Sequence, residues 1–498
     1  MRESASFANT GKMPGGGLSG QGNRLAARTL FWLWLGSFLP HLVIALIFLN
    51  YPIALDDMFQ YDMLARSLVE GHGYRWYTQA DVDKLKPYLQ QFLDVSKMNV
   101  PPEGLVTTFR APGYPFFLAG IYALVPSQDH FAAARLAQAA LLSLLAPASA
   151  LIALKLGAGR KVAVAAGAGM ALYPILWLYP AGLASEDLFI PLVTFGVLAV
   201  LWAAESRSPW RTVLAGLLLG GAMLTRSVIA PFVLLAALWT WRYGRARFRT
   251  LALLAVAFGI CLPWAVRNTQ IMGRPSFVET GLGYQLYVGY HPGGDGSFVS
   301  SIAIPPLTIL NDAQRDSYTT RMALEFIRSD PLGALGKILE RPVYFFGLED
   351  RELIYFYSNN FFGAIPQPWL ALGYLWVVLP WIGVALLALI GLFHVPDRRA
   401  GRLAAALILG YTLPHLLVIA EPRFHLALVP VMIPLAAIAW SQRQAVLSRL
   451  LARQDAWSWA ARLSPLLLLA LWIWGIGMHW QSLVSLFAPG GNLLRWTY

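Results

Sequence analysis

The chain has 498 residues, of which 57% are hydrophobic and only 13% are charged, and its mean hydropathy is +0.54. Soluble domains carry about 25% charged residues, so the composition excludes a series of ordinary soluble domains. The apolar residues come in blocks, and blocks of about 20 residues match the ~30 Å hydrocarbon core of a bilayer. The sequence therefore predicts an all-α polytopic membrane protein.

Eleven apolar blocks are predicted to be membrane-spanning helices. They cover residues 29–49, 131–155, 162–180, 187–204, 211–225, 228–241, 250–267, 369–393, 403–420, 424–440 and 465–487. A further run, Tyr114–Val125, has about 12 residues, which is too short to cross a bilayer unaided. We expect this run to form an interfacial or re-entrant helix.

Basic residues are spread unequally over the segments between these blocks. If Tyr114–Val125 does not cross, alternate segments hold 20 basic and 4 acidic residues, and the rest of the chain holds 18 basic and 22 acidic residues. Cytoplasmic loops are rich in Lys and Arg, so the first set predicts the cytoplasmic side and a cytoplasmic N-terminus. This asymmetry explains the net charge of +12 without a nucleic-acid partner.

The same reading divides the chain into three parts. Residues 1–28, rich in Gly and Ser, predict a disordered basic cytoplasmic tail. Residues 29–440 form a transmembrane module with large outer loops at 50–130 and 268–368, and residues 441–498 hold a cytoplasmic loop and the last span. Amphipathic stretches in the first outer loop, near 59–68 and 85–93, predict helices in the membrane interface. The single cysteine, Cys261, excludes an intrachain disulfide.

Ionisable residues cluster where the predicted spans meet the outer face. Charges at the edge of the hydrocarbon are costly unless they are paired or face a hydrated cavity, so they are candidates for function. A carboxylate can accept a proton from an attacking hydroxyl group, and an arginine can hold a departing phosphate. The candidates are Asp56, Asp57, Arg110, Glu186, Arg226, Arg267, Glu421, Arg423 and His425.

Each candidate also has a purely structural interpretation. Asp56 can cap the helix that follows it, and Glu186 stands at a helix start, where the helix dipole favours an acid. Arg226 and Arg267 can be boundary residues whose stems cover apolar surface. The other structural interpretations are a salt bridge for Arg110, a mutual pair for Glu421 and Arg423, and plain hydrogen bonding for His291, His415 and His425.

Several motifs follow one another in a recognisable order. The first outer loop begins with Asp56-Asp57-Met58-Phe59-Gln60-Tyr61 and continues through Ala65-Arg66-Ser67-Leu68 to Glu70-Gly71-His72-Gly73-Tyr74. Later motifs are Arg110-Ala111-Pro112-Gly113-Tyr114-Pro115, Ser185-Glu186, Leu224-Thr225-Arg226, Pro263-Trp264-Ala265-Val266-Arg267-Asn268, Gly289–Gly296, Ala323–Arg328 and Glu421-Pro422-Arg423-Phe424-His425. Together, over about Leu30–Trp440, they resemble the GT-C glycosyltransferases, and more closely the bacterial relatives of protein O-mannosyltransferases and of lipid A aminoarabinose transferases.

The resemblance implies a GT-C-like fold and an enzyme that moves a sugar from a polyprenyl-phosphate donor to an acceptor at the outer face of the cell inner membrane, with inversion at the anomeric carbon. It implies catalytic roles for Asp56, Asp57 and Glu186, donor-phosphate binding by Arg110, Arg226, Arg267 and Arg423, and an acceptor or cavity role for Tyr61, Tyr114, Glu421 and His425. No cofactor is certain, and a divalent metal is left open, with Asp57 and His291 as candidate ligands. The expected partners are the donor, membrane lipids and an unidentified acceptor.

Two other functions share part of this pattern. An outer-face polymerase or ligase that uses a diphosphate-linked oligosaccharide would need the same arginines, and only the donor separates it from the first interpretation. A lipid-linked sugar flippase or transporter is the third. Transporters place ionisable residues near the bilayer midplane and often have two repeated halves, whereas the charges here lie at one face.

Overall fold

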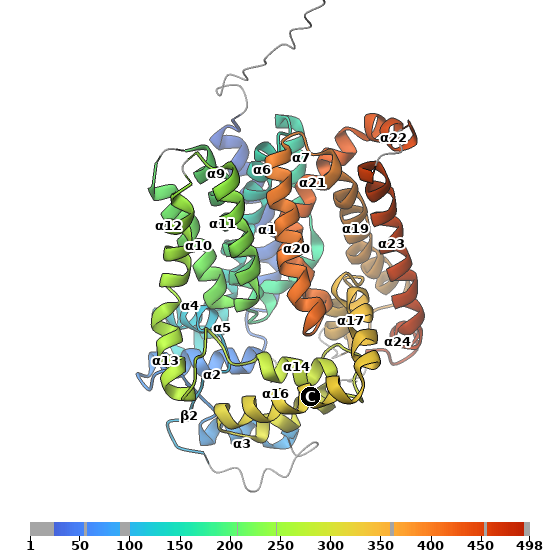
Figure 1. Cartoon of the computed structure of the whole chain (residues 1–498). Helices are drawn as coiled ribbons and strands as arrows, with labels where there is room; N and C mark the ends of the chain where they lie inside the picture. Colours follow the sequence, from blue (N-terminus) through green and yellow to red (C-terminus); the bar gives the residue numbers. More distant parts are fainter. Residues whose placement is uncertain are drawn as a thin grey trace, which may run out of the picture.

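The computed structural model of the chain describes residues 24–53, 57–89, 100–206, 208–245, 247–358, 363–452 and 456–492. Within these ranges the chain is helical apart from loops and one two-stranded sheet. The longer helices run side by side as a bundle, and shorter helices gather at one end of it (Figure 1). The all-α architecture predicted from the hydropathy is confirmed.

Seven helical segments of the described chain are long and apolar enough to cross a membrane. Five of them are single helices: α1 (Ala27–Ile47), α9 (Glu186–Glu205), α19 (Gln367–His394), α20 (Arg398–Leu417) and α23 (Ala456–Met478). The other two are built from consecutive elements: η2 (Ser127–Asp129) with α5 (His130–Ser143) and α6 (Leu145–Lys155), and η6 (Pro422–Leu428) with α21 (Val429–Ser441).

Two further pairs of helices are apolar enough to cross a membrane only when taken together, and each pair is bent by 45°. The first joins α7 (Arg160–Ala171) to α8 (Pro174–Leu178) and η3 (Tyr179–Ala181), and the second joins α12 (Arg249–Gly259) to α13 (Leu262–Met272). Pro174 and Pro263 stand at the start of the second halves. A proline has no N–H to donate and its ring clashes with the carbonyl four residues earlier, which explains both breaks.

The two remaining predicted blocks fall on shorter apolar helices. These are α10 (Trp210–Thr225) and η4 (Ser227–Ile229) continued by α11 (Ala230–Tyr243). All eleven blocks therefore coincide with helices. Within the described ranges, seven of them have the length and hydropathy expected of a span, or nine if each bent pair is one span. The count of eleven crossings stays a prediction.

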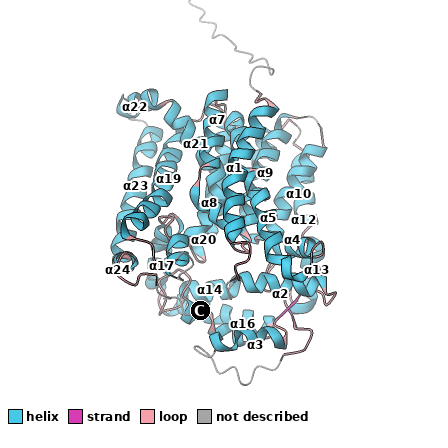
Figure 2. Ribbon diagram, turned by 180° about the vertical axis from the view of Figure 1, so that it is seen from behind, coloured by secondary structure: helices cyan, strands magenta, loops and turns pink. Residues whose placement is uncertain are grey.

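The two large loops fold into short elements at the same end of the bundle, which we call the loop end. The first loop contains α2 (Asp57–Val69), β1 (Arg75–Trp76), α3 (Gln79–Leu89), β2 (Leu105–Val106) and α4 (Gly113–Tyr122). The second contains α14 (Leu282–Tyr290), α15 (Ser300–Ala303), η5 (Pro305–Thr308), α16 (Asp312–Ser329), α17 (Pro331–Phe345) and α18 (Arg351–Ser358). From behind, α2, α3, α14 and α16 again lie together below the bundle, opposite α22 (Arg443–Ala452) (Figure 2). The last described helix is α24 (Trp480–Leu486).

Helix α2 is more enclosed than an amphipathic interface helix would be. Its residues from Phe59 to Ala65 are all buried, and it packs against α4 and β1. The apolar side chains that predict an interfacial helix are thus covered by the protein itself. The second amphipathic stretch, 85–93, is described only as far as the end of α3, and Tyr114–Val125 corresponds to the ten-residue α4 at the loop end.

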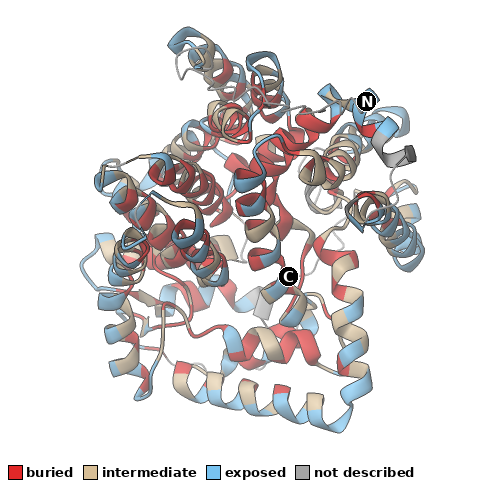
Figure 3. Ribbon diagram, turned by 45° about the horizontal axis from the view of Figure 1, so that its top comes forward, coloured by how far each residue is buried: buried red, intermediate tan, exposed pale blue. Residues whose placement is uncertain are grey.

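Burial separates central helices from peripheral ones. The span Pro422–Ser441 is 83% buried, whereas Ala27–Ile47 is 22% and Ser458–Met478 is 17% buried. Figure 3 shows buried residues on the inner faces of the helices and exposed residues around the outside. Helix α21 packs against α19, α6 and α7, so η6, which precedes it, is placed in the middle of the molecule. This position brings the charged residues of η6 to the centre of the loop end.

Candidate functional site

A chain of ion pairs joins five charged residues at the loop end, which we call the arginine–carboxylate cluster: Asp57, Arg110, Glu186, Arg226 and Arg423. Asp57 pairs with Arg110 through one carboxylate oxygen and with Arg423 Nη2 through the other, at 3.2 Å. Glu186 Oε1 lies 3.0 Å from Arg226 Nη1 and 3.8 Å from Arg423 Nε. Arg423 therefore bridges the two carboxylates, and the cluster carries one positive charge in excess.

The five residues come from five separate segments, and three of them, Asp57, Glu186 and Arg226, are placed favourably at helix ends. Asp57 begins α2, Arg110 lies between β2 and α4, and Arg423 belongs to η6. Glu186 is the first residue of α9 and Arg226 follows the last residue of α10. A carboxylate at a helix N-terminus and a cation at a helix C-terminus both interact favourably with the helix dipole, so the local structure supports this pair.

Exposure decreases across the cluster from Asp57 to Glu186. The side chains of Asp57 and Arg423 are 34% and 31% exposed, those of Arg110 and Arg226 are 19% and 18% exposed, and that of Glu186 is 3% exposed. A ligand can therefore reach Asp57 and Arg423 more easily than Glu186. In the ion pairs that Asp57 forms with Arg110 and Arg423, an anionic ligand can therefore replace the carboxylate.

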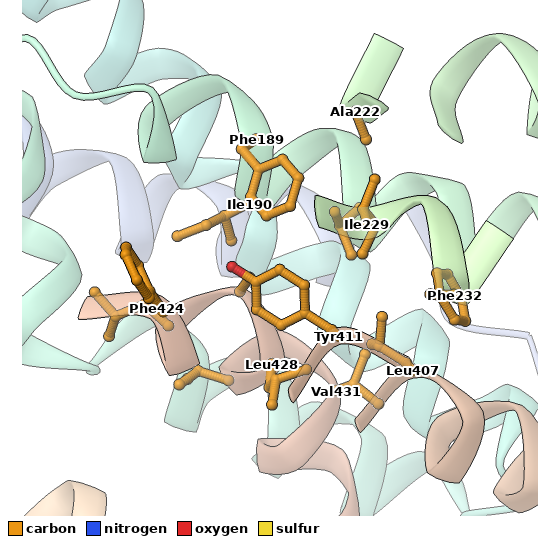
Figure 4. Close-up of a cluster of buried hydrophobic side chains, with 14 of the residues drawn as sticks. Phe189, Ile190, Ala222, Ile229, Phe232, Leu407, Tyr411, Phe424, Leu428 and Val431 are labelled. Atoms are coloured by element: carbon orange, nitrogen blue, oxygen red, sulfur yellow. The ribbon is translucent and has the colours of Figure 1, made fainter. Parts of the chain in front are cut away.

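Apolar side chains line the cluster on its inner side. Figure 4 shows Phe189, Ile229 and Phe424, which follow Glu186, Arg226 and Arg423 closely in sequence, packed around Tyr411. The guanidinium carbon of Arg226 lies 5.1 Å from the ring centre of Phe424 and 5.9 Å from that of Phe189. Electrostatic interactions strengthen where water is excluded, so this lining raises the strength of the inner ion pairs.

The charge state of the exposed carboxylate follows from its two arginines. Burial disfavours the ionised form of Asp57, but Arg110 and Arg423 outweigh burial and hold its pKa well below the usual value. Asp57 in turn helps to raise the pKa of Arg110 above its ordinary value, against the opposing effect of burial. Asp57 is therefore ionised throughout the physiological range. In this arrangement it is a strong partner for arginine and a weak proton acceptor.

Two tyrosines predicted at the site lie on the Arg110 side of it. The guanidinium carbon of Arg110 is 5.5 Å from the ring centre of Tyr61, and the Tyr61 and Tyr114 rings meet edge to face at 5.0 Å. The Tyr114 hydroxyl donates a hydrogen bond to Gln138. Tyr61 thus borders the cluster directly, and Tyr114 supports Tyr61 from behind.

Gln60 contacts the cluster, although the sequence did not single it out as a site residue. Its amide oxygen accepts a hydrogen bond from Arg110 Nε at 2.8 Å, and its amide nitrogen donates to the Tyr77 hydroxyl at 3.2 Å. A signal existed, because Gln60 stands in the motif that begins at Asp56. Tyr411 had no such signal, because it lies in the apolar helix α20.

Arg267 lies outside the arginine–carboxylate cluster. It donates hydrogen bonds to the backbone oxygen of Thr107 at 3.0 Å and to the Asn268 side chain at 2.9 Å. Its guanidinium carbon lies 4.5 Å from the ring centre of Trp264 and 5.3 Å from that of Tyr74. These contacts attach the middle of α13 to the first loop, so Arg267 does not stand at the end of a span as the sequence suggested, because α13 continues to Met272.

Glu421 and Arg423 do not form the mutual pair that was considered for them. Glu421 pairs with Arg351 and accepts a hydrogen bond from the backbone nitrogen of Phe298 at 2.7 Å, whereas Arg423 turns to Asp57 and Glu186. Glu421 precedes η6 with an extended backbone, whereas Arg423 lies within the 3₁₀ turn, so the two side chains leave the backbone in different directions. Glu421 holds the second loop instead of contributing to the cluster.

His425 is buried away from the cluster. Its Nδ1 lies 2.8 Å from the Phe345 backbone oxygen, its Nε2 lies 3.0 Å from Glu349 Oε1, and its ring stacks on Trp381 with centroids 3.9 Å apart. The Tyr173 hydroxyl also donates to Glu349. His425 is therefore part of a closed polar group, and its side chain is 0% exposed.

The candidate metal ligands do not come together among the described residues, where no group of three His, Cys, Asp or Glu side chains is arranged to hold a metal ion. His291 accepts a hydrogen bond from the backbone nitrogen of Gly293 at 3.1 Å, and its ring packs against Tyr287 and Phe326. Asp57 faces arginines. Asp56, the candidate base, lies outside the described residues.

Gly113 permits the close approach that brings Arg110 and Arg226 into one site. A Cβ atom on Gly113 would lie 2.6 Å from Thr225 Oγ1 and 2.9 Å from the Leu224 backbone oxygen. Those atoms belong to the last turn of α10, directly before Arg226. A side chain at position 113 would push the start of α4 away from α10.

Comparisons with known proteins give a likeness of fold. No family model matches the chain, and no curated protein matches its sequence. An archaeal oligosaccharyltransferase, AglB from Archaeoglobus fulgidus, in complex with an inhibitory peptide and a dolichol-phosphate, matches with a TM-score of 0.43 and 14% identity over 90% of this chain and 55% of that chain. The apo form of the Archaeoglobus fulgidus oligosaccharyltransferase matches with a TM-score of 0.46 and 12% identity over 93% and 56% of the two chains.

ArnT from Cupriavidus metallidurans, bound to undecaprenyl phosphate, matches with a TM-score of 0.35 and 14% identity over 86% of this chain and 82% of that chain. Both kinds of protein are GT-C membrane glycosyltransferases, the superfamily that the sequence motifs resemble. The present chain spans about half the length of the oligosaccharyltransferases. All three TM-scores are below 0.5, so the function has to be inferred from the side chains of the chain itself.

Proposed function

We propose that this protein is a glycosyltransferase that moves a sugar from a polyprenyl-phosphate donor to an acceptor hydroxyl or amine on the outer face of the cell membrane. The observation that carries the proposal is the arginine–carboxylate cluster at the loop end of an apolar helix bundle. Three arginines, an excess of positive charge and access from the Asp57 side suit an anionic group whose lipid tail lies in the bilayer.

A donor phosphate fits the cluster by taking the place of Asp57. Guanidinium groups bind phosphate oxygens through charge-assisted hydrogen bonds, and Arg110 and Arg423 each already donate one such bond to a carboxylate oxygen of Asp57. Glu186 keeps Arg226 and the other side of Arg423 in place while the exchange occurs. The arginines then stabilise the negative charge that the phosphate gains as the bond to the sugar breaks.

The reaction is a single displacement at the anomeric carbon. The acceptor oxygen or nitrogen forms a bond to this carbon, and the bond from the carbon to the phosphate oxygen breaks, with its electron pair leaving on the phosphate. The acceptor proton passes to a carboxylate. Asp56 is our candidate for this base, and Asp57 becomes a stronger proton acceptor only after the phosphate has taken over its arginines, because those arginines lower its pKa.

Transfer assays on two neighbouring substitutions test the assignment of roles. A positioned base contributes ~10²–10⁴-fold to the rate, so Asp56→Asn should slow transfer at least ~10²-fold and leave donor binding intact. Asp57→Asn should change donor affinity as well, because it removes the anion that competes for the arginines. The first measurement is the rate at which membranes transfer labelled sugar from the polyprenyl-phosphate-linked donor to the acceptor. The second is the affinity of each variant for the donor. Normal transfer by Asp56→Asn would move the search for the base to Asp57 and Glu186.

The orientation of the chain is part of the proposal and has its own test. In a background with Cys261→Ala, single cysteines at Arg245 and Asp295 should react with a membrane-impermeant maleimide from opposite sides, because Arg245 belongs to the basic set and Asp295 to the second loop. We expect position 295 to be labelled in intact cells and position 245 only after permeabilisation. Labelling of position 245 in intact cells would overturn the outer-face location of the cluster.

The chemistry of the donor separates this proposal from a ligase that uses diphosphate-linked oligosaccharides. Three arginines can hold one phosphate or two, so binding of undecaprenyl phosphate and undecaprenyl diphosphate should be compared under the same conditions. We expect the monophosphate to bind at least as tightly as the diphosphate. A clear preference for the diphosphate would favour the ligase.

A further inference from the structure

The backbone that carries Arg110 is buried and attached from several sides. Thr107 and Thr108 are 0% exposed, and Phe109 and Ala111 are 4% exposed. The Tyr74 hydroxyl donates hydrogen bonds to the backbone oxygens of Arg110 and Ala111, at 3.0 and 3.1 Å. The orientation of Arg110 toward Asp57 is therefore set by the segment 107–111 as a whole.

The strongest of these attachments comes from the second large loop. Asp312, the first residue of α16, accepts hydrogen bonds from Thr107 Oγ1 at 2.8 Å, from the Thr108 backbone nitrogen at 2.5 Å and from Thr108 Oγ1 at 3.1 Å. All three bonds go to one carboxylate oxygen, and the other oxygen pairs with Arg315. Hydrogen bonds to a charged acceptor in a site closed to water are the strong ones, so Asp312 holds this segment firmly.

Residues from the same loop complete the attachment. The backbone nitrogen of Thr280 donates to the Thr108 oxygen at 3.0 Å, and the hydroxyl groups of Thr280 and Thr108 are 2.9 Å apart. Arg315 lies over the ring of Phe109, with its guanidinium carbon 4.7 Å from the ring centre. Only Phe109 separates Thr108 from Arg110, so a shift of the backbone at Thr108 is transmitted to the guanidinium group.

We propose that Asp312 is a positioning residue that, from the second large loop, sets Arg110 in the donor-phosphate site. The inference rests on the proposed function, because it concerns the arginine that we assign to the phosphate. Asp312 does not touch the cluster; it acts through Thr107 and Thr108. The two large loops, about 200 residues apart in sequence, thus build one phosphate site together.

Asp316 offers a matched control one turn further along α16. It also pairs with an arginine, Arg274, and also accepts a backbone hydrogen bond, from Gly283 at 3.3 Å. These partners lie in the second half of the molecule and outside segment 107–111. A change in the stability of α16 alone should therefore appear in both variants, whereas a change in the position of Arg110 should appear only in Asp312→Ala.

The experiment measures binding of undecaprenyl phosphate to the full chain in lipid nanodiscs by native mass spectrometry. Loss of a charge-assisted contact lowers affinity roughly 10- to 150-fold, so we expect Asp312→Ala, which displaces Arg110 without removing it, to weaken binding about 10-fold. Asp316→Ala should stay within about twofold of the unchanged protein. Asp312→Asn, which keeps an acceptor oxygen for Thr107 and Thr108, should recover most of the loss.

A double substitution distinguishes positioning from a general structural effect. If Asp312 acts through Arg110, Asp312→Ala should add less than about twofold to the loss already caused by Arg110→Ala, because coupled residues are not additive. Losses that multiply, or normal binding by Asp312→Ala, would overturn the positioning role while leaving the phosphate site intact. Normal binding by Arg110→Ala would instead overturn the phosphate role of Arg110 and this inference with it.

A second variant covers the case in which Asp312→Ala does not fold. Thr107→Val removes one of the bonds to Asp312 at nearly constant side-chain volume. It should lower donor affinity about threefold, and only when Arg110 is present.

Discussion

Arg423 and His425 are two residues apart on η6, and they belong to opposite kinds of polar site. The Arg423 side chain is 31% exposed and shares its charge between Asp57 and Glu186, at 3.2 and 3.8 Å. The His425 side chain is 0% exposed, and both of its ring nitrogens are engaged, with Phe345 and with Glu349. One site is open and made of ion pairs, and the other is closed and made of contacts to buried groups and of ring stacking.

The difference shows how a binding site can be told from a structural one when both are polar. A buried polar group is stable only if its hydrogen bonds are satisfied within the protein, and a group of that kind has nothing left to offer a ligand. A partly exposed ion pair contributes little to stability, and its arginine can release the carboxylate and bind an incoming anion instead. We therefore propose a functional role for Arg423 and a structural role for His425.

The largest expected effect is on stability and concerns His425. His425→Ala removes the ring that stacks on Trp381 and leaves the buried Glu349 with fewer partners. Loss of a large buried ring typically costs about 3–5 kcal/mol, so we expect a clear fall in the unfolding temperature of the detergent-solubilised protein. Donor affinity of the fraction that remains folded should change less than about threefold. A large loss of affinity without loss of stability would assign His425 to the binding site.

Next in size is the effect of Arg423 on donor binding. Arg423→Ala removes the bridge between Asp57 and Glu186, and the loss of a charge-assisted contact is about 1.5–3 kcal/mol, or roughly 10- to 150-fold in affinity. The measurement is undecaprenyl phosphate binding in nanodiscs. Arg274→Ala is the matched control, because Arg274 is also at the loop end and also paired with an aspartate, but outside the cluster. Equal affinities of the two variants would remove the contrast between Arg423 and His425.

The smallest effect is the pH dependence of stability that comes from Asp57. Its pKa is lowered in the folded protein, so its ion pairs contribute fully above the unfolded pKa of about 3.9 and are lost only as the pH falls through the lower folded value. An ion pair this exposed is worth about 1 kcal/mol or less. The difference in unfolding temperature between the unchanged protein and Asp57→Asn should therefore be constant from about pH 5 to 8 and shrink below about pH 4. A difference that already disappears near pH 6 would contradict the lowered pKa.

Much of this molecule could be read from hydropathy and from motifs. Blocks of about 20 apolar residues predict spanning helices because only a helix satisfies its backbone hydrogen bonds within a bilayer, and every predicted block falls on a helix. The motifs also contained all five members of the arginine–carboxylate cluster. Because each span returns the chain to a membrane face, charged residues at alternate turns are expected at one end of the bundle, even when they are far apart in sequence.

Which of the candidates touch one another was decided only by the tertiary structure. Arg267 and Arg226 both end apolar blocks in the sequence, yet Arg267 lies inside α13 and attaches a loop, whereas Arg226 caps α10 and pairs with Glu186. Glu421, Arg423 and His425 lie within five residues, yet they contact three different sets of partners, because Glu421 precedes η6 and the other two lie on different sides of its 3₁₀ turn. The sequence predicts which segments form apolar helices and which turns carry charge, since both follow from local composition. The direction of a side chain depends on helix rotation and on neighbours from distant segments, and no local pattern contains that information.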